Sequence, residues 1–120
     1  MKNGGFKDEI RIYNNLGIIY KRSGNLEAAK SNYDIALNID KNSFFPNYNM
    51  GVLKAHQKDN ELNPKTNNLS NIEECLMYFE NALRIAREQK EEVYEINVLV
   101  NMALIYERTI EYDKAICCLE

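Results

Sequence analysis

The sequence predicts an all-α fold in which antiparallel helix pairs stack into an array of about three repeats. The first observation is the spacing of Tyr13, Leu16, Gly17 and Tyr20, whose steps of three and four place them on one helical face. The second is that similar segments recur along the chain. One helix pair cannot bury both of its faces, so we expect recurring pairs to pack on each other.

The first helix pair has the clearest signals. We expect its first helix over residues 7–22, after a frayed lead-in at residues 1–6 in which two glycines oppose helix formation. Gly24 interrupts the apolar pattern, and Asn25 suits the N-cap of a second helix over residues 26–39. Small residues in both helices would allow the two to approach closely.

The next two helices follow from local capping signals. We expect Ser43 to cap a third helix that ends near residue 56, with a proline tolerated in its first turn. Residues 57–69 are polar and contain a proline and several asparagines, which predicts a loop insertion. The capping-box pattern Ser70-x-x-Glu73 predicts the start of a fourth helix that ends near residue 90.

The last part of the chain is expected to hold one more helix pair. A fifth helix is predicted over residues 92–108, a turn over residues 109–112, and a sixth helix from there to the end. The expected total is therefore six helices and no strand.

Two short motifs set the register of the repeats. The first-helix motif occurs three times, 34 and then 52 residues apart: Asn15-Leu16-Gly17, Asn49-Met50-Gly51 and Asn101-Met102-Ala103. The second-helix motif, with two residues four positions apart, also occurs three times: Ala29 with Tyr33, Cys75 with Phe79, and Ala115 with Leu119. One domain is predicted, with repeats at about 10–43, 44–90 (insertion 57–69) and 91–120 (incomplete).

These motifs resemble the tetratricopeptide repeat over roughly residues 10–120. The residues that match the family pattern in the first repeat are Tyr13, Leu16, Gly17, Tyr20, Ala29, Tyr33 and Ala36. The chain departs from it by having no Trp, no proline that closes a repeat, and Lys54 where Tyr20 and Tyr106 stand in the other repeats. The resemblance implies a right-handed superhelical solenoid that binds proteins rather than catalysing a reaction.

Composition narrows the function classes. The net charge is −3 with both signs interspersed, which argues against nucleic-acid and membrane partners. Three cysteines without metal-ligand spacing, and no apolar leader, indicate a reducing, cytoplasmic location. A single histidine, His56, and no nucleophile beside a base predict no active site, metal or cofactor.

Three asparagines, Asn15, Asn49 and Asn101, stand at the same position of each first helix. The resemblance implies that first helices line a concave groove. In family members that resemble O-linked sugar transferases, asparagines in this groove bind the backbone of an extended peptide. An amide can do so because it both donates and accepts hydrogen bonds. The alternative is that each amide only bonds to a neighbouring helix.

Helical geometry extends the row of three asparagines to a longer stripe of residues on the first helices. Residues four before, three after and seven after each asparagine share its face. They are Arg11, Ile18 and Arg22 in the first repeat, Phe45, Val52 and His56 in the second, and Asn97, Leu104 and Arg108 in the third. Amides, apolar residues and a basic rim predict a peptide partner with apolar anchors and acidic character. The resemblance also implies a second binding mode, in which Lys, Asn and Arg side chains of some family members clamp the C-terminal carboxylate of a partner. Such a clamp is not expected here, because only Asn49 matches its residue types.

The sequence leaves the biological role open between three interpretations. The first is a scaffold or adaptor that holds a partner peptide. The second is the substrate-recruiting arm of a larger enzyme such as an O-linked sugar transferase, and the third is an architectural subunit of a large assembly. Ile116 and Leu119 would lie at an uncovered end, so we interpret the chain as a fragment with further repeats or domains beyond Glu120. The alternative interpretation is a chain that ends there with a frayed last turn.

Overall fold

The computed structural model describes the backbone of residues 2–57 and 64–119, and the side chains of residues 6–55, 72–111 and 113. This part of the chain contains five helices and no strand: α1 (Lys2–Arg22), α2 (Leu26–Ile39), α3 (Phe44–Gln57), α4 (Pro64–Gln89) and α5 (Glu92–Leu119). The all-α prediction is confirmed, and the predicted number of helices is wrong by one.

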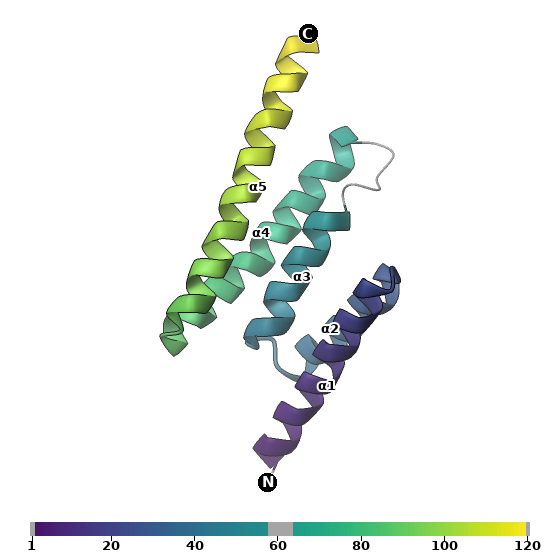
Figure 1. Ribbon diagram of the computed structural model, residues 1–120, viewed down its shortest axis with the longest axis vertical. Helices are drawn as coiled ribbons and strands as arrows, with labels where there is room; N and C mark the ends of the chain where they lie inside the picture. Colours follow the sequence, from purple (N-terminus) through teal and green to yellow (C-terminus); the bar gives the residue numbers. More distant parts are fainter. Residues whose placement is uncertain (1, 58–63, 120) are drawn as a thin grey trace.

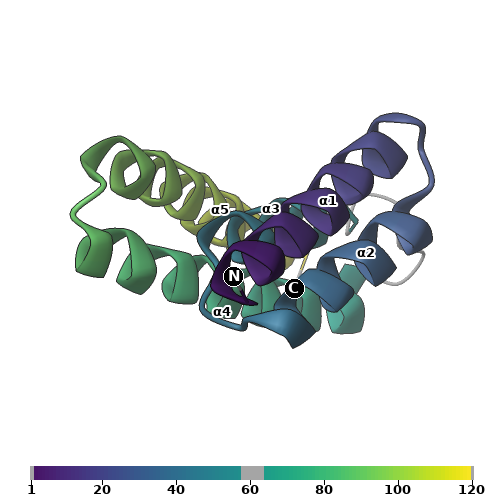
Figure 2. The same cartoon turned by 90° about the horizontal axis from the view of Figure 1, so that it is seen from below.

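The helices pack in sequential pairs (Figure 1). Helix α1 packs against α2 and α3 against α4, while α5 packs against α4 and contacts α3. The first helices of the pairs, α1, α3 and α5, form one layer, and α2 and α4 form the other (Figure 2). The radius of gyration is 15.6 Å and the extents are 60 × 31 × 19 Å. A compact domain of this length would have a radius of about 14 Å, so the stack is elongated, as expected for a helical repeat array.

A glycine facing an aromatic ring fixes the contact inside each of the first two pairs. Gly17 of α1 faces Tyr33 of α2, and a Cβ at Gly17 would lie 2.6 Å from Tyr33 Cδ1. Gly51 of α3 faces Phe79 of α4 in the same way, with Phe79 Cε1 2.6 Å from the Cβ position. Both rings are buried, at 1% and 0% exposure. The predicted close approach of the helices therefore depends on the missing side chain.

The turn between α1 and α2 follows the sequence prediction. Gly24 has a φ of +89°, in the left-handed region that glycine adopts without strain. The side chain of Asn25 accepts a hydrogen bond from the backbone N–H of Ala28 at 3.1 Å, so it caps α2. Local chemistry alone is sufficient to end one helix here and begin the next.

The departure of Lys54 from the repeat pattern has a structural reason. Lys54 is buried, and its Nζ lies 3.3 Å from Oε2 of Glu74 on α4. A buried ammonium group needs such a partner. An ion pair between α3 and α4 thus takes the place that a tyrosine holds at this position in the other repeats.

Cys75 occupies the position of Ala29 in the second pair and is packed in the core. Its side chain is fully buried, and its Sγ donates to the carbonyl oxygen of Gly51 at 3.2 Å. Burial raises the pKa of the Cys75 thiol to about 12, against a partial opposing effect of the charge on Arg108. The thiol is therefore protonated and unreactive at neutral pH.

Helix α5 corrects the prediction of a turn and a sixth helix. It runs without interruption from Glu92 to Leu119, through the residues expected to turn. The segment 109–112 contains no glycine and no proline. Thr109 uses its hydroxyl to donate to the carbonyl oxygen of Ile105 at 2.9 Å, a bond within the helix. Nothing in the local sequence therefore forces the helix to end.

The predicted insertion at residues 57–69 is partly wrong. Gln57 is the last residue of α3, and α4 begins at Pro64, so residues 64–69 are helical. Ser70 consequently lies inside α4 rather than at its N-cap. Proline has a φ suited to the first position of a helix, where its missing N–H costs nothing. Its presence indicated a helix start and not a loop; residues 58–63 lie outside the described part of the chain.

The expected lead-in at residues 1–6 is also mostly helical, because α1 begins at Lys2. Gly4 and Gly5 each lower helix propensity by about 1 kcal/mol relative to alanine. They do not block the backbone conformation, however, and a helix that is already packed can extend through them.

Candidate functional site

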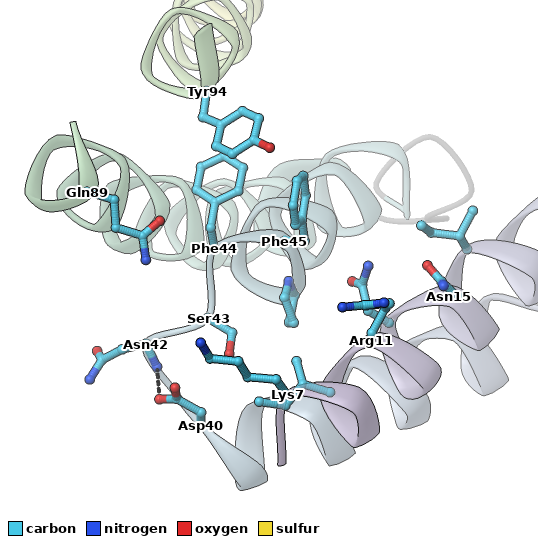
Figure 3. Close-up of a pocket in the computed structure, with 14 residues that line it drawn as sticks. Lys7, Arg11, Asn15, Asp40, Asn42, Ser43, Phe44, Phe45, Gln89 and Tyr94 are labelled. Atoms are coloured by element: carbon cyan, nitrogen blue, oxygen red, sulfur yellow. Dashed lines mark hydrogen bonds between the residues drawn. The ribbon is translucent and has the colours of Figure 1, made fainter. Parts of the chain in front are cut away.

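A pocket of about 610 Å³ lies between α1, the α2–α3 connection and the first turn of α3, with Gln89 and Tyr94 on its far side (Figure 3). It combines basic, amide and aromatic side chains. The residues of α1 and the connection that line it are Lys7, Ile10, Arg11, Asn14, Asn15, Ile18, Asp40, Asn42 and Ser43. Those of α3 are Phe44, Phe45 and Pro46. The pocket therefore joins two consecutive helix pairs on the layer of first helices.

An aromatic cluster forms the wall of the pocket opposite α1. Phe44 is buried and stacks on Tyr94 of α5, with ring centroids 4.8 Å apart and an interplanar angle of 17°. Phe45 meets Phe44 edge-on at 5.1 Å and Tyr94 at 5.1 Å, and 46% of its surface is exposed. Phe44 fixes the position of Phe45, which offers an exposed ring to an apolar side chain of a ligand.

Basic side chains of α1 face this aromatic wall. Lys7 and Arg11 stand one helical turn apart on α1. In Figure 3 the side chain of Lys7 extends toward Ser43, and that of Arg11 lies between α1 and Phe45. The ion pair of Arg11 with Asp8 is weak, because the closest N–O distance is 4.0 Å and both side chains are more than 70% exposed. Asp40 is the one acidic residue in the lining. The charged side chains of the lining are thus two basic residues and one acidic residue.

Two of the three register asparagines already have partners within the protein. Asn49 donates from Nδ2 to Oδ1 of Asn14 at 2.9 Å, which joins α3 to α1. Asn101 donates to the hydroxyl of Tyr48 at 2.9 Å, which joins α5 to α3, and to a backbone carbonyl of α5 at 2.8 Å. The two acceptors, Asn14 and Tyr48, stand 34 residues apart and therefore occupy the same position in successive first helices. These contacts tie successive first helices together.

Asn15 differs from the other two asparagines because its side chain is exposed and lines the pocket. The pocket also contains three more residues of the predicted stripe, Arg11, Ile18 and Phe45. These four residues come from two helix pairs. The structure therefore brings together the first part of the stripe at one place.

The other described residues of the predicted stripe are not among those that line the pocket. Val52 is half-buried against the core, and Arg108 donates to the carbonyl oxygen of Ala55 at 3.3 Å. The exposed members are Arg22 at the end of α1, and Asn97 and Leu104 on α5. The side chain of His56 lies outside the described residues. Binding by these residues stays a prediction.

Several pocket residues were not singled out from the sequence. Lys7 stands one turn before Arg11 on the same helical face, so the stripe rule applied once more would have included it. Tyr94 could not be found in this way, because it reaches the pocket only through the packing of α5 on the first turn of α3. Asn14 is nearly buried, and it stands one position outside the asparagine register, so the register did not include it.

Comparison with known protein families found a match to the first helix pair. A family model described as a tetratricopeptide repeat matches residues 10–43, which include most of α1, all of α2 and the Gly17–Tyr33 contact. Residues 10–43 are a tetratricopeptide repeat. Comparisons with curated proteins and with solved structures found no match. The tetratricopeptide repeat is a protein–protein interaction module, so the chain carries at least one unit of that kind.

The geometry of this tetratricopeptide repeat recurs in the next helix pair. Gly51 and Phe79 of α3 and α4 repeat the contact of Gly17 with Tyr33. The bounds predicted for the second and third repeats remain predictions. Only a tetratricopeptide repeat was identified, and no catalytic domain. Within the described residues no group of three or more His, Cys, Asp or Glu side chains could hold a metal ion, and no helix there could cross a membrane.

Proposed function

We propose that this protein is a non-enzymatic scaffold or adaptor that binds an extended partner peptide on the layer formed by α1, α3 and α5. The main contact is the pocket between α1 and α3. The observation that carries the proposal is the convergence of Arg11, Asn15, Ile18 and Phe45 on that pocket. They supply charge, an amide and apolar surface within one site.

Three of these side chains have distinct tasks in the proposed complex. Phe45 contacts an apolar anchor of the peptide, because its ring is held in place on one side and exposed on the other. Arg11 attracts an acidic side chain next to that anchor. Asn15 bonds to the peptide backbone, which any sequence provides. Asn49 and Asn101 hold the first helices in register instead of contacting the peptide.

The proposal can be tested with fluorescein-labelled short peptides in which a Leu or Phe stands near an Asp or Glu. A matched set carries Lys in place of each acidic residue. We expect the acidic set to bind more tightly, and Arg11→Glu to weaken its binding several-fold in fluorescence anisotropy. This loss should shrink at high salt, because exposed charges are screened. Asn15→Ala should weaken binding by a few-fold to about tenfold, the effect of one neutral hydrogen bond.

Lys30→Glu provides the matched control. It makes the same charge change on α2, in the other layer, at a side chain paired with Asp34 on the protein surface. We expect this variant to bind both peptide sets like the parent protein. Equal losses for Arg11→Glu and Lys30→Glu would contradict the pocket as the binding site, since only general charge would then matter.

A further inference from the structure

Helix α5 exposes the face that α1 and α3 use to hold their second helices. Ala103 stands at the register position of Gly17 and Gly51, yet its side chain is exposed. Apolar residues extend this face along the helix with exposed fractions of 40–59%: Ile96, Leu99, Tyr106 and Ile110. We call these five residues the open face of α5. A neighbouring side of the helix is packed in the core through Val98, Met102 and Ile105.

The residues after this face carry the pattern of a second helix. Leu119 follows Ala103 by 16 residues, as Tyr33 follows Gly17, and Ala115 stands where Ala29 does in the first repeat. In the first repeat the chain reverses between these two motifs at Gly24, whose φ is +89°. The same register in the third repeat is Thr109-Ile110-Glu111, which has no glycine.

Without that turn, the residues that carry the second-helix pattern cannot pack on the open face of the same chain. Because α5 continues to Leu119, its C-terminal end projects past the other helices (Figure 1). A straight helix cannot fold back onto itself. It can, however, pack antiparallel on the same face of an identical helix.

We propose that two copies of this chain exchange residues 109–119 of α5, each packing on Ala103, Tyr106 and Ile110 of the other copy. Ala103 of one copy then meets Leu119 of the other, and the reciprocal contact forms by symmetry. The twofold axis passes near Glu111, midway between those two residues. Such an interface is isologous, as in most homodimers, and exchange of an identical element is a low-cost route to it.

The arrangement is sterically simple, because the packed part of each copy lies at the opposite end of the paired helices. It also explains why α5 is apolar on both sides, which is unusual for a surface helix. The exchange is independent of the pocket between α1 and α3, so it stands or falls separately from the proposed peptide binding.

The first test is the mass of the 120-residue chain by sedimentation equilibrium over a range of concentrations. We expect a dimer that dissociates on dilution. Thr109→Ser/Ile110→Gly/Glu111→Asn introduces the turn of the first repeat and should give a monomer with a similar circular dichroism spectrum. The control Thr109→Ala/Glu111→Ala keeps the helix continuous and should remain a dimer. A parent protein that is monomeric at all concentrations would overturn the proposal.

Disulfide cross-linking identifies the contact. In a Cys117→Ser/Cys118→Ser background, chains with Ala103→Cys are mixed with chains with Leu119→Cys and oxidised. Cys75 is buried and should not react. We expect disulfide-linked dimers in the mixture and none from Ala103→Cys alone, because its two copies would lie about 24 Å apart along the helix axis.

The remaining outcomes of the cross-linking each overturn the proposal. A dimer that forms no disulfide in the mixture would use another surface. Chains that carry both Ala103→Cys and Leu119→Cys could instead form the disulfide within a monomer. That result would show that the segment folds back on its own chain as a sixth helix.

Discussion

The contact of Gly17 with Tyr33 gives the sharpest test of how the helix pairs are held together. Gly17→Ala adds one methyl group where the ring of Tyr33 lies 2.6 Å away at its Cδ1 atom, too close for any carbon–carbon contact. The ring is 1% exposed and cannot move freely. Overpacking of this kind costs roughly 1–3 kcal/mol, whereas replacing a helical glycine with alanine gains about 1 kcal/mol.

We therefore expect Gly17→Ala to lower the free energy of unfolding by about 1 kcal/mol, the difference between those two effects. For a domain of this length that loss corresponds to a fall in Tm of about 4 °C. The measurement is thermal unfolding followed by circular dichroism at one fixed protein concentration.

The decisive control is the same change in a Tyr33→Leu background. Leu lacks the ring, so the added methyl group has space and only the gain in helix propensity remains. Gly17→Ala should then raise the stability of that variant by up to about 1 kcal/mol. A loss of the same size in both backgrounds would refute the reasoning, because the cost could not come from the ring.

Three further predictions concern polar groups and the buried thiol. Asn49→Ala should lower the free energy of unfolding, measured by denaturant titration, by about 1–3 kcal/mol, because it leaves the nearly buried amide of Asn14 without its partner. The control, Asn15→Ala, changes an exposed side chain and should alter the free energy of unfolding by less than about 0.5 kcal/mol. Asn25→Ala removes the N-cap of α2 and should cost about 1 kcal/mol by thermal melting, and an unchanged Tm would contradict the cap. The raised pKa of Cys75 means that the unfolded chain loses this proton above pH 9 while the folded chain keeps it to about pH 12. Stability should therefore fall as the pH rises from 9 to 10, and less steeply in Cys75→Ala.

The asparagine register shows how a correct sequence pattern can have a different physical basis from the one expected. Asn49 and Asn101 repeat because each joins its helix to the preceding first helix. Their amides are directed along the stack, which leaves fewer donors for a peptide. Asn15 stands at the same register and has its amide exposed beside the pocket.

The sequence by itself determined the features that depend on neighbouring residues. Helical periodicity, the glycine turn before α2 and the cap at Asn25 involve residues at most four positions apart, so their energetics can be read locally. The recurrence of Gly17 at Gly51 likewise identified the face on which the pairs close. The all-α fold and its helix pairs followed from these signals.

Only the tertiary structure decided where distant residues meet. Tyr94 reaches the pocket across 50 residues of chain from Phe44, and Asn101 finds Tyr48 across 53. Such contacts depend on distances between packed helices, which no local pattern encodes. The continuity of α5 also could not be predicted from local sequence patterns. A second-helix pattern predicts a turn before it, but whether the chain turns depends on what covers the open face.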